Sequence, residues 1–280
     1  PSVASMLTWI ARDRGHFAAE GIDLEIQADR AAGLVTDSIL SGQTDMVYGG
    51  VTTLMIPYAK GAPLVSVATT SYDTTWEVIV LPESPARKIE DLKGKTIAVI
   101  AANTSCVLAL RNYFDHNKLP ADFVKFTVVS PPDQVAAFAA KRVDASCMFD
   151  PFRLQMQKQF GGRAIWHIRE GRFGKNVDGN LVMGRAFVEK NPKTVAAVQR
   201  AIGKAADEAN ASPELVYSTL AGVLKRDIAG VREMSLPKFA SPPSMPEDVK
   251  AVAEALHRFG FVDKPIDVKG YDRSSLAAAQ

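Results

Sequence analysis

The feature that most constrains the fold is one pattern of helices and strands that occurs twice along the chain. Each copy has, in order, a helical pattern, an aspartate, a short apolar run and a turn-forming residue pair. The first copy ends at 49–50 and its aspartate is Asp45, whereas the second ends at 150–151 and its aspartate is Asp144. Strands that alternate with helices predict mainly parallel sheets flanked by helices. Two copies in a chain of this length predict two α/β lobes of one design.

The hydrophobic periodicity predicts further elements outside the repeated pattern. Two long helices near the C-terminus begin with a capping residue followed by proline, at 191–192 and 212–213, which is typical of a helix start. We predict strands at 22–26, 46–48, 64–69, 78–81, 96–100, 123–129, 145–149 and 180–183, and helices at 6–17, 34–40, 51–59, 107–117, 135–140, 192–210, 213–225 and 246–260.

Composition excludes several classes of protein. The formal net charge is +2 and the basic residues are scattered, so we expect no nucleic-acid partner. No run reaches the roughly 18 apolar residues of a membrane span. No leader precedes Pro1, so the protein is expected to be cytosolic or to have lost a leader.

Signals of catalysis and of metal binding are absent from the sequence. There is no nucleophile elbow and no P-loop lysine, and glycine-rich segments do not match a dinucleotide fingerprint. We therefore expect no enzyme activity, no cofactor and no metal. None of the four histidines has metal-ligand spacing; they are His16, His116, His167 and His257.

The two cysteines, Cys106 and Cys147, lie far apart in the sequence and form no disulfide framework. We interpret them as small buried apolar residues. A disulfide between them is the alternative in an oxidising compartment.

Three loops have the composition of a ligand site. They lie at 31–33, 49–52 and 103–105, and they combine small residues with short polar side chains. In open parallel sheets, ligands bind beyond the carboxyl ends of strands, where the first N–H groups of the following helix are unpaired. Such groups bind anions without a formal cation. Ordinary turn and cap chemistry is the alternative for each loop.

Five segments in order resemble one family of ABC-importer solute-binding proteins, those for aliphatic sulfonates, taurine, nitrate and thiamine-precursor pyrimidines. The resemblance spans about residues 4–210. Relatives often have Trp-Glu-Pro-Tyr where this chain has Phe149–Phe152. The segments are ARDRGHFAAEGIDLEI (11–26), SGQTDMVYGG (41–50), IEDLKGKTIAV (89–99), PPDQVAAFAAKRVDASCMFDPF (131–152) and NLVMGRAFVEKNP (180–192).

The resemblance implies a type II periplasmic-binding-protein fold with two chain crossovers. It places the first lobe at 1–83 plus 179–280 and the second at 84–178. The family begins with a strand ahead of the segment equivalent to Pro1–Ser5, which this chain lacks. The implied ligand contacts are Ser5, Met6, Ala32, Gly33, Gly50, Val51, Thr52, Asn103, Thr104, Ser105 and Asp150. Tyr72 and Trp76 lie near the first crossover, where relatives can contribute a wall, and ordinary core or hinge packing is the alternative for Trp76.

The expected function is capture of a small molecule by lobe closure, followed by docking on a membrane permease. Hydroxyls and helix termini favour a small organic anion such as an aliphatic sulfonate, whereas Asp150 favours an amino group; taurine satisfies both. A pyrimidine or aromatic ligand is the main alternative, and an enzyme or a regulator's sensor domain on the same fold is less favoured. We expect an extracytoplasmic monomer.

Overall fold

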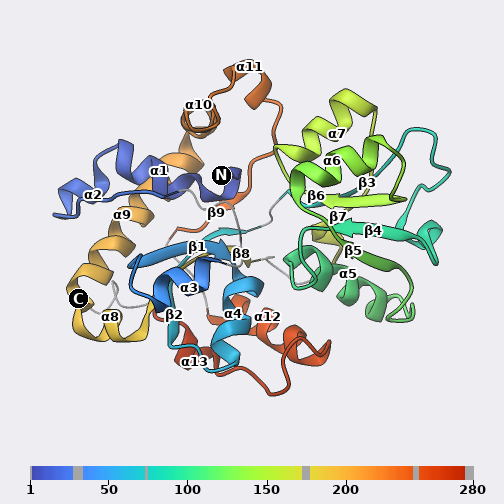
Figure 1. Cartoon of the computed structure of the whole chain (residues 1–280). Coiled ribbons are helices and arrows are strands. Elements are labelled where there is room, and N and C mark those ends of the chain that lie inside the picture. The colour runs from blue at the N-terminus through green and yellow to red at the C-terminus, as the bar shows by residue number, and fades with distance from the viewer. Residues whose placement is uncertain (1, 28–33, 73–74, 172–176, 242–245, 275–280) are drawn as a thin grey trace.

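The computed structural model describes residues 2–27, 34–72, 75–171, 177–241 and 246–274, which form two lobes around two sheets (Figure 1). The sheet of the first lobe has the order β1-β8-β2-β9. Its strands are β1 (Met46–Gly50), β8 (Val177–Gly184), β2 (Leu64–Tyr72) and β9 (Lys238–Phe239). The helices of this lobe are η1 (Val3–Ser5), α1 (Met6–Asp13), α2 (His16–Ala19), α3 (Leu34–Leu40), α4 (Val51–Ala59), α8 (Arg185–Lys190), α9 (Pro192–Ala211), α10 (Pro213–Leu224), α11 (Ile228–Val231), α12 (Pro246–Arg258) and α13 (Val268–Tyr271).

The sheet of the second lobe has the order β5-β4-β6-β3-β7. Its strands are β3 (Glu77–Val80), β4 (Thr96–Val99), β5 (Lys125–Val128), β6 (Ala145–Met148) and β7 (Arg163–His167). The helices of this lobe are η2 (Ile89–Leu92), α5 (Ser105–His116), α6 (Pro131–Ala139), α7 (Phe152–Phe160) and η3 (Ile168–Gly171). The two-lobed α/β architecture predicted from the sequence is therefore confirmed.

The core of the first lobe is built on α9, whose apolar residues recur at helical spacing. Val195, Val198 and Ile202 are buried and belong to the same cluster as Ile10 of α1. Small residues such as Ala205 let the two helices approach closely, and burial of each large aliphatic side chain contributes about 1.5–3 kcal/mol. No helix in the described ranges is long and apolar enough to cross a membrane.

Strand pairing moves the first crossover ahead of the expected boundary at 83/84. β3 pairs with β6 and β7 and therefore belongs to the second sheet, although it was expected in the first lobe. Its apolar run resembles a hairpin partner of β2, but it is buried between two strands that come later in the sequence. The chain thus leaves the first lobe after Tyr72 and returns with β8, whose first residue is Val177.

The first sheet is not mainly parallel, which corrects the sequence prediction. β8 returns between β1 and β2 and pairs antiparallel with both, and β9 pairs antiparallel with β2. In the second sheet, β4 is parallel to β5 and β6, whereas β3 is antiparallel to its neighbours. The residues at 22–26, expected to be a strand, pair with no described strand. The helix expected at 6–17 is broken at Gly15, whose φ of 76° ends α1 and begins α2.

The two lobes also touch away from the crossovers, through α5 and the C-terminal helices. Leu108 of α5 packs in an apolar cluster of the first lobe, and Arg111 lies over the ring of Phe261 at 5.6 Å. Arg258 of α12 forms an ion pair with Asp115 at 3.6 Å. The helix α5 is therefore held between the second sheet and the first lobe.

Candidate functional site

A cavity of about 760 Å³ lies between the two lobes. Its walls come from the N-terminal segment, β1 and α4 of the first lobe, and from the loops that follow β4 and β6 in the second lobe. Seven of the residues expected at a ligand site line it. They are Ser5, Gly50, Thr52, Trp76, Thr104, Ser105 and Asp150.

The remaining expected residues lie elsewhere. Met6, Val51 and Tyr72 are core residues with at most 8% of their surface exposed, because their apolar side chains point into the first lobe. Asn103 lies in the turn before α5 and does not line the cavity. Ala32 and Gly33 lie outside the described residues.

The first lobe presents the N-terminus of α4 to the cavity. α4 follows β1 without an intervening residue, since Gly50 is both the last residue of the strand and the N-cap of the helix. No side chain caps this helix. Thr52 in its first turn is 2% exposed, and its hydroxyl has no hydrogen-bond partner among the described residues. A buried donor of this kind costs free energy until a ligand or a water satisfies it.

The second lobe presents the N-terminus of α5. Thr104 is the N-cap, and its hydroxyl accepts a hydrogen bond from the backbone N–H of Val107. Ser105 donates a hydrogen bond across the cavity to Oδ1 of Asp178, at 2.5 Å, in β8 of the first lobe. Two helix N-termini, one from each lobe, therefore border one cavity, and each carries a partial positive charge.

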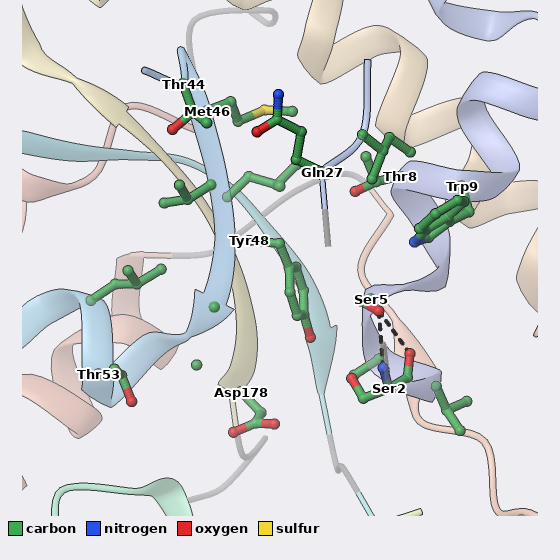
Figure 2. Close-up of a pocket in the computed structure, with 18 of the residues that line it drawn as sticks. Ser2, Ser5, Thr8, Trp9, Gln27, Thr44, Met46, Tyr48, Thr53 and Asp178 are labelled. Atoms are coloured by element: carbon green, nitrogen blue, oxygen red, sulfur yellow. Dashed lines mark hydrogen bonds between the residues drawn. The ribbon is translucent and has the colours of Figure 1, made fainter. Parts of the chain in front are cut away.

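Asp178 and Tyr48 form the floor between these helices. Figure 2 shows the phenol of Tyr48 directed from β1 toward the end of β8 where Asp178 lies. Burial raises the pKa of Tyr48, and the Asp178 carboxylate raises it further, so the phenol stays protonated and can donate a hydrogen bond. Neither residue was expected from the sequence, because neither lies in a loop before a helix.

The residue after Asp178 is a glycine for steric reasons. A Cβ at Gly179 would collide with the hydroxyl oxygens of Ser71 and Thr70 on β2, and would lie 2.9 Å from that of Tyr48. The backbone N–H of Gly179 donates to Ser71 Oγ at 3.1 Å. Gly179 thus packs against three hydroxyls while its neighbour Asp178 lines the cavity, and this Asp-Gly pair is the local signal that could have marked the site.

Asp150 lines the cavity, but its carboxylate is occupied by protein donors. Arg153 donates to both oxygens, at 3.1 and 2.9 Å, and the backbone N–H groups of Leu154 and Ser235 donate at 3.3 and 2.9 Å. Arg153 also contacts Glu77 at 3.2 Å. Burial raises the pKa of Glu77, and the ion pair with Arg153 opposes that shift. The cluster ties α7 of the second lobe to Ser235, which precedes β9 of the first.

Aromatic side chains cover another part of the cavity. Trp76 follows the first crossover and Phe149 follows β6, and their ring centroids are 4.7 Å apart in an edge-to-face arrangement. Both residues line the cavity. Such a pair offers an apolar surface to a ligand. Within the described ranges, no cluster of three or more His, Cys, Asp or Glu residues could hold a metal ion.

Comparison with known proteins shows the family to which the chain belongs. The sequence model described as NMT1/THI5 like matches residues 4–215. The chain belongs to the NMT1/THI5-like family. A Brucella abortus protein named as a binding protein is 24% identical over 276 residues, which cover 95% of this chain and 85% of that protein. The match to the family model therefore covers most of the first lobe and all of the second.

Solved structures share the fold. The alkanesulfonate-binding protein of Xanthomonas axonopodis, bound to MOPS, has a TM-score of 0.81 and 20% identity, over 97% of this chain and 95% of that one. A protein from Methylobacillus flagellatus, titled a periplasmic sulfonate-binding protein of a sulfonate ABC transporter, has a TM-score of 0.77 and 20% identity, over 99% and 87%. The desulfurization enzyme DszB, with biphenyl-2-sulfinic acid, has a TM-score of 0.71 and 18% identity, over 100% and 95%.

Proposed function

We propose that this protein is the solute-binding component of an ABC importer and captures a small organic anion, an aliphatic sulfonate of the taurine type, between its lobes. The observation that carries the proposal is the pair of helix N-termini, α4 and α5, at one interlobe cavity. The sulfonate-binding proteins that share this fold support the same ligand class.

Recognition of the sulfonate follows from unpaired donors. The first-turn N–H groups of α4 and α5 and the hydroxyl of Thr52 would donate to its oxygens, without an obligatory arginine. Lobe closure requires a differential affinity of about 5 kcal/mol for the closed state. Three or four charge-assisted hydrogen bonds, at about 1.5–3 kcal/mol each, suffice.

Recognition of the amino group falls to Asp178 rather than Asp150. Both residues line the cavity, but the Asp150 carboxylate accepts four hydrogen bonds from Arg153, Leu154 and Ser235, whereas the Asp178 carboxylate, which accepts from Ser105, lies beside the two helix N-termini. A ligand with a sulfonate and an ammonium group two carbons apart can address both features. We therefore expect a zwitterionic sulfonate to bind more tightly than a simple alkanesulfonate.

A pyrimidine or other aromatic compound is the second candidate ligand. Trp76 and Phe149 would form its stacking surface, and Asp178 would accept from an exocyclic amino group. An enzyme on this fold is a weaker alternative, supported only by the likeness to DszB. The proposed partner is the membrane permease of the importer, the proposed location is the periplasm or its extracytoplasmic equivalent, and the proposed state is a monomer.

Titration calorimetry with three probes tests the proposal: taurine, butane-1-sulfonate and 4-amino-5-hydroxymethyl-2-methylpyrimidine. We expect taurine to bind most tightly. Asp178→Asn should weaken taurine binding by roughly 10- to 100-fold, from the loss of one charge-assisted hydrogen bond, and should change butane-1-sulfonate binding far less. Binding of the pyrimidine alone would favour the second candidate, and no heat with either sulfonate would contradict the proposal.

A further inference from the structure

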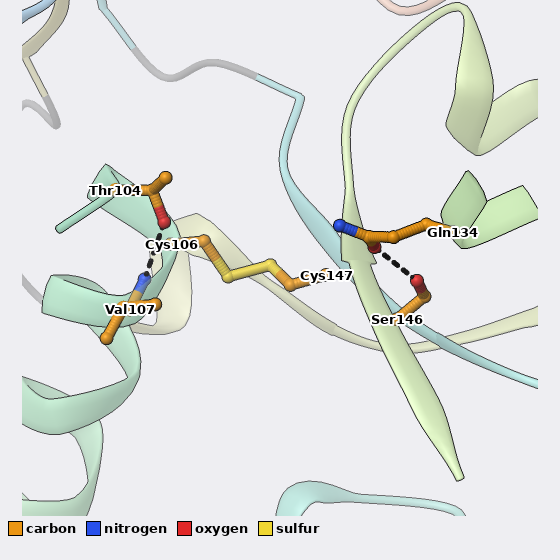
Figure 3. The surroundings of a disulfide bond; sticks show 6 residues. All are labelled: Thr104, Cys106, Val107, Gln134, Ser146 and Cys147. Atoms are coloured by element: carbon orange, nitrogen blue, oxygen red, sulfur yellow. Dashed lines mark hydrogen bonds between the residues drawn. A yellow bond between two sulfur atoms is a disulfide. The ribbon is translucent and has the colours of Figure 1, made fainter. Parts of the chain in front are cut away.

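A disulfide joins the two segments of the second lobe that reach the cavity. Cys106 lies in the first turn of α5 and Cys147 lies in β6, 41 residues later, and their Cα atoms are 6.7 Å apart (Figure 3). Both cysteines are fully buried. This decides between the two interpretations left open by the sequence.

Residues that line the cavity lie within two sequence positions of each cysteine. On one side, Thr104 and Ser105 directly precede Cys106. On the other side, Phe149 follows Cys147 by two positions and packs edge-to-face on Trp76 at 4.7 Å. One covalent bond therefore connects the polar and the aromatic parts of the wall formed by the second lobe.

Apart from this bond, the first turn of α5 is held by the Ser105–Asp178 hydrogen bond to the other lobe and by one capping hydrogen bond. α4 follows its strand directly, but α5 is separated from β4 by the loop 100–104. The capping hydrogen bond from Val107 N to Thr104 Oγ1 is long, at 3.4 Å. Helix ends fray, and donors that move bind an anion less well than donors fixed in advance.

We propose that the Cys106–Cys147 disulfide is a positioning element of the ligand site. It holds the first turn of α5 against β6, so that the N–H groups of that turn, the Ser105 hydroxyl and the Phe149 ring keep a fixed arrangement before ligand arrives. Ligand affinity then depends on the oxidised state of this pair. The affinity part of the inference rests on the proposed function, whereas the ordering of α5 does not.

The first test compares two destabilised variants by calorimetry with taurine as the probe. Cys106→Ala/Cys147→Ala removes the bond, and Phe114→Leu destabilises the same lobe at the opposite end of α5, where Phe114 is 1% exposed. We expect roughly tenfold weaker binding in the double variant and less than twofold change in Phe114→Leu. Equal losses in both variants would reduce the disulfide to a general stabiliser and overturn the proposal.

The second test needs no ligand and no substitution. Hydrogen exchange of the wild-type protein is compared before and after reduction of the disulfide under native conditions, with thiol labelling to verify reduction. We expect at least tenfold faster exchange at residues 106–109, and unchanged exchange in the first turn of α4 and in the C-terminal half of α5. Unchanged exchange at 106–109 would overturn the proposal whichever ligand binds, while faster exchange without taurine binding would contradict only the proposed ligand.

Discussion

The two helix N-termini at the cavity differ in how far the protein itself satisfies them. In the second lobe, Thr104 caps α5, Ser105 bonds to Asp178 and a disulfide holds the first turn. In the first lobe, no side chain caps α4 and the buried hydroxyl of Thr52 has no partner among the described residues. A ligand gains most where it satisfies donors that are otherwise unpaired. The second lobe thus offers a wall that is already fixed, and the first lobe offers hydrogen-bond donors that a ligand can satisfy.

The fixed wall is anchored by the buried Arg153 cluster, and removing its cation should have the largest effect. Arg153→Met leaves the carboxylates of Asp150 and Glu77 without their counter-ion. We expect a loss of about 3–5 kcal/mol in the free energy of unfolding, measured by urea denaturation. Arg232→Met, which breaks an exposed ion pair with Glu214, should leave the unfolding midpoint unchanged. A midpoint for Arg153→Met equal to that of this control would show that the anchor is not needed.

An isosteric substitution tests whether the Thr52 hydroxyl of the first lobe donates to the ligand. Thr52→Val removes the hydroxyl and keeps the shape, so ligand binding should weaken about tenfold, or about 1.4 kcal/mol. The ligand-free protein should be as stable as the wild type or slightly more stable, because no buried donor remains unpaired.

Thr69→Val is the matched control for Thr52→Val. Thr69 is also fully buried, and its hydroxyl likewise has no hydrogen-bond partner in the described part of the chain, but it does not line the cavity. Its substitution should affect thermal stability in the same direction and leave the affinity unchanged. If both variants lose affinity equally, the loss at Thr52 does not report a ligand contact.

The smallest expected effects are pH dependences of opposite sign in the two lobes. The pKa of Glu77 is raised by burial, so its contribution to stability is present below the unfolded pKa of 4.5 and is lost as pH rises through the higher folded value. The pKa of Glu20 is lowered by the hydrogen bonds that Arg200 and then Lys204 donate to its carboxylate. Its contribution is present above pH 4.5 and is lost as pH falls through the lower folded value.

Unfolding midpoints between pH 3 and pH 8 separate these two contributions. Glu77→Gln should remove the loss of stability at rising pH, and Glu20→Gln should remove part of the loss at falling pH. The effect of Glu20→Gln should be the weaker one, because Arg200 and Lys204 are about half exposed and water screens their charges. For each variant, the difference in unfolding midpoint from the wild type is plotted against pH. If this difference changed in the same direction for Glu77→Gln and Glu20→Gln, the assignment of the two environments would be contradicted.

The elements that the sequence predicts well are those with local signals. α9 and α10 begin at the predicted residues, because a capping residue and a proline at the start mark a helix without reference to the rest of the fold. The antiparallel insertion of β8 between β1 and β2 was not predictable, because a pairing between residues more than a hundred positions apart leaves no local pattern.

The residues of the candidate site also fall into those with a local sequence signal and those that depend on long-range strand pairing. Gly50, Thr52, Thr104 and Ser105 were predictable, because small and short polar residues where a strand passes into a helix mark their own position at the sheet edge. Asp178 depends on where β8 is inserted and was missed. The pairing of Asp150 with Arg153 has a local signal, since the two residues are three positions apart at the start of α7.

A crystal structure of the protein grown with taurine tests the central claim most directly. We predict sulfonate oxygens within hydrogen-bonding distance of the first-turn N–H groups of both α4 and α5, and the ammonium group beside Asp178. Density for taurine outside the interlobe cavity, or sulfonate contacts to only one of the two helices, would contradict it.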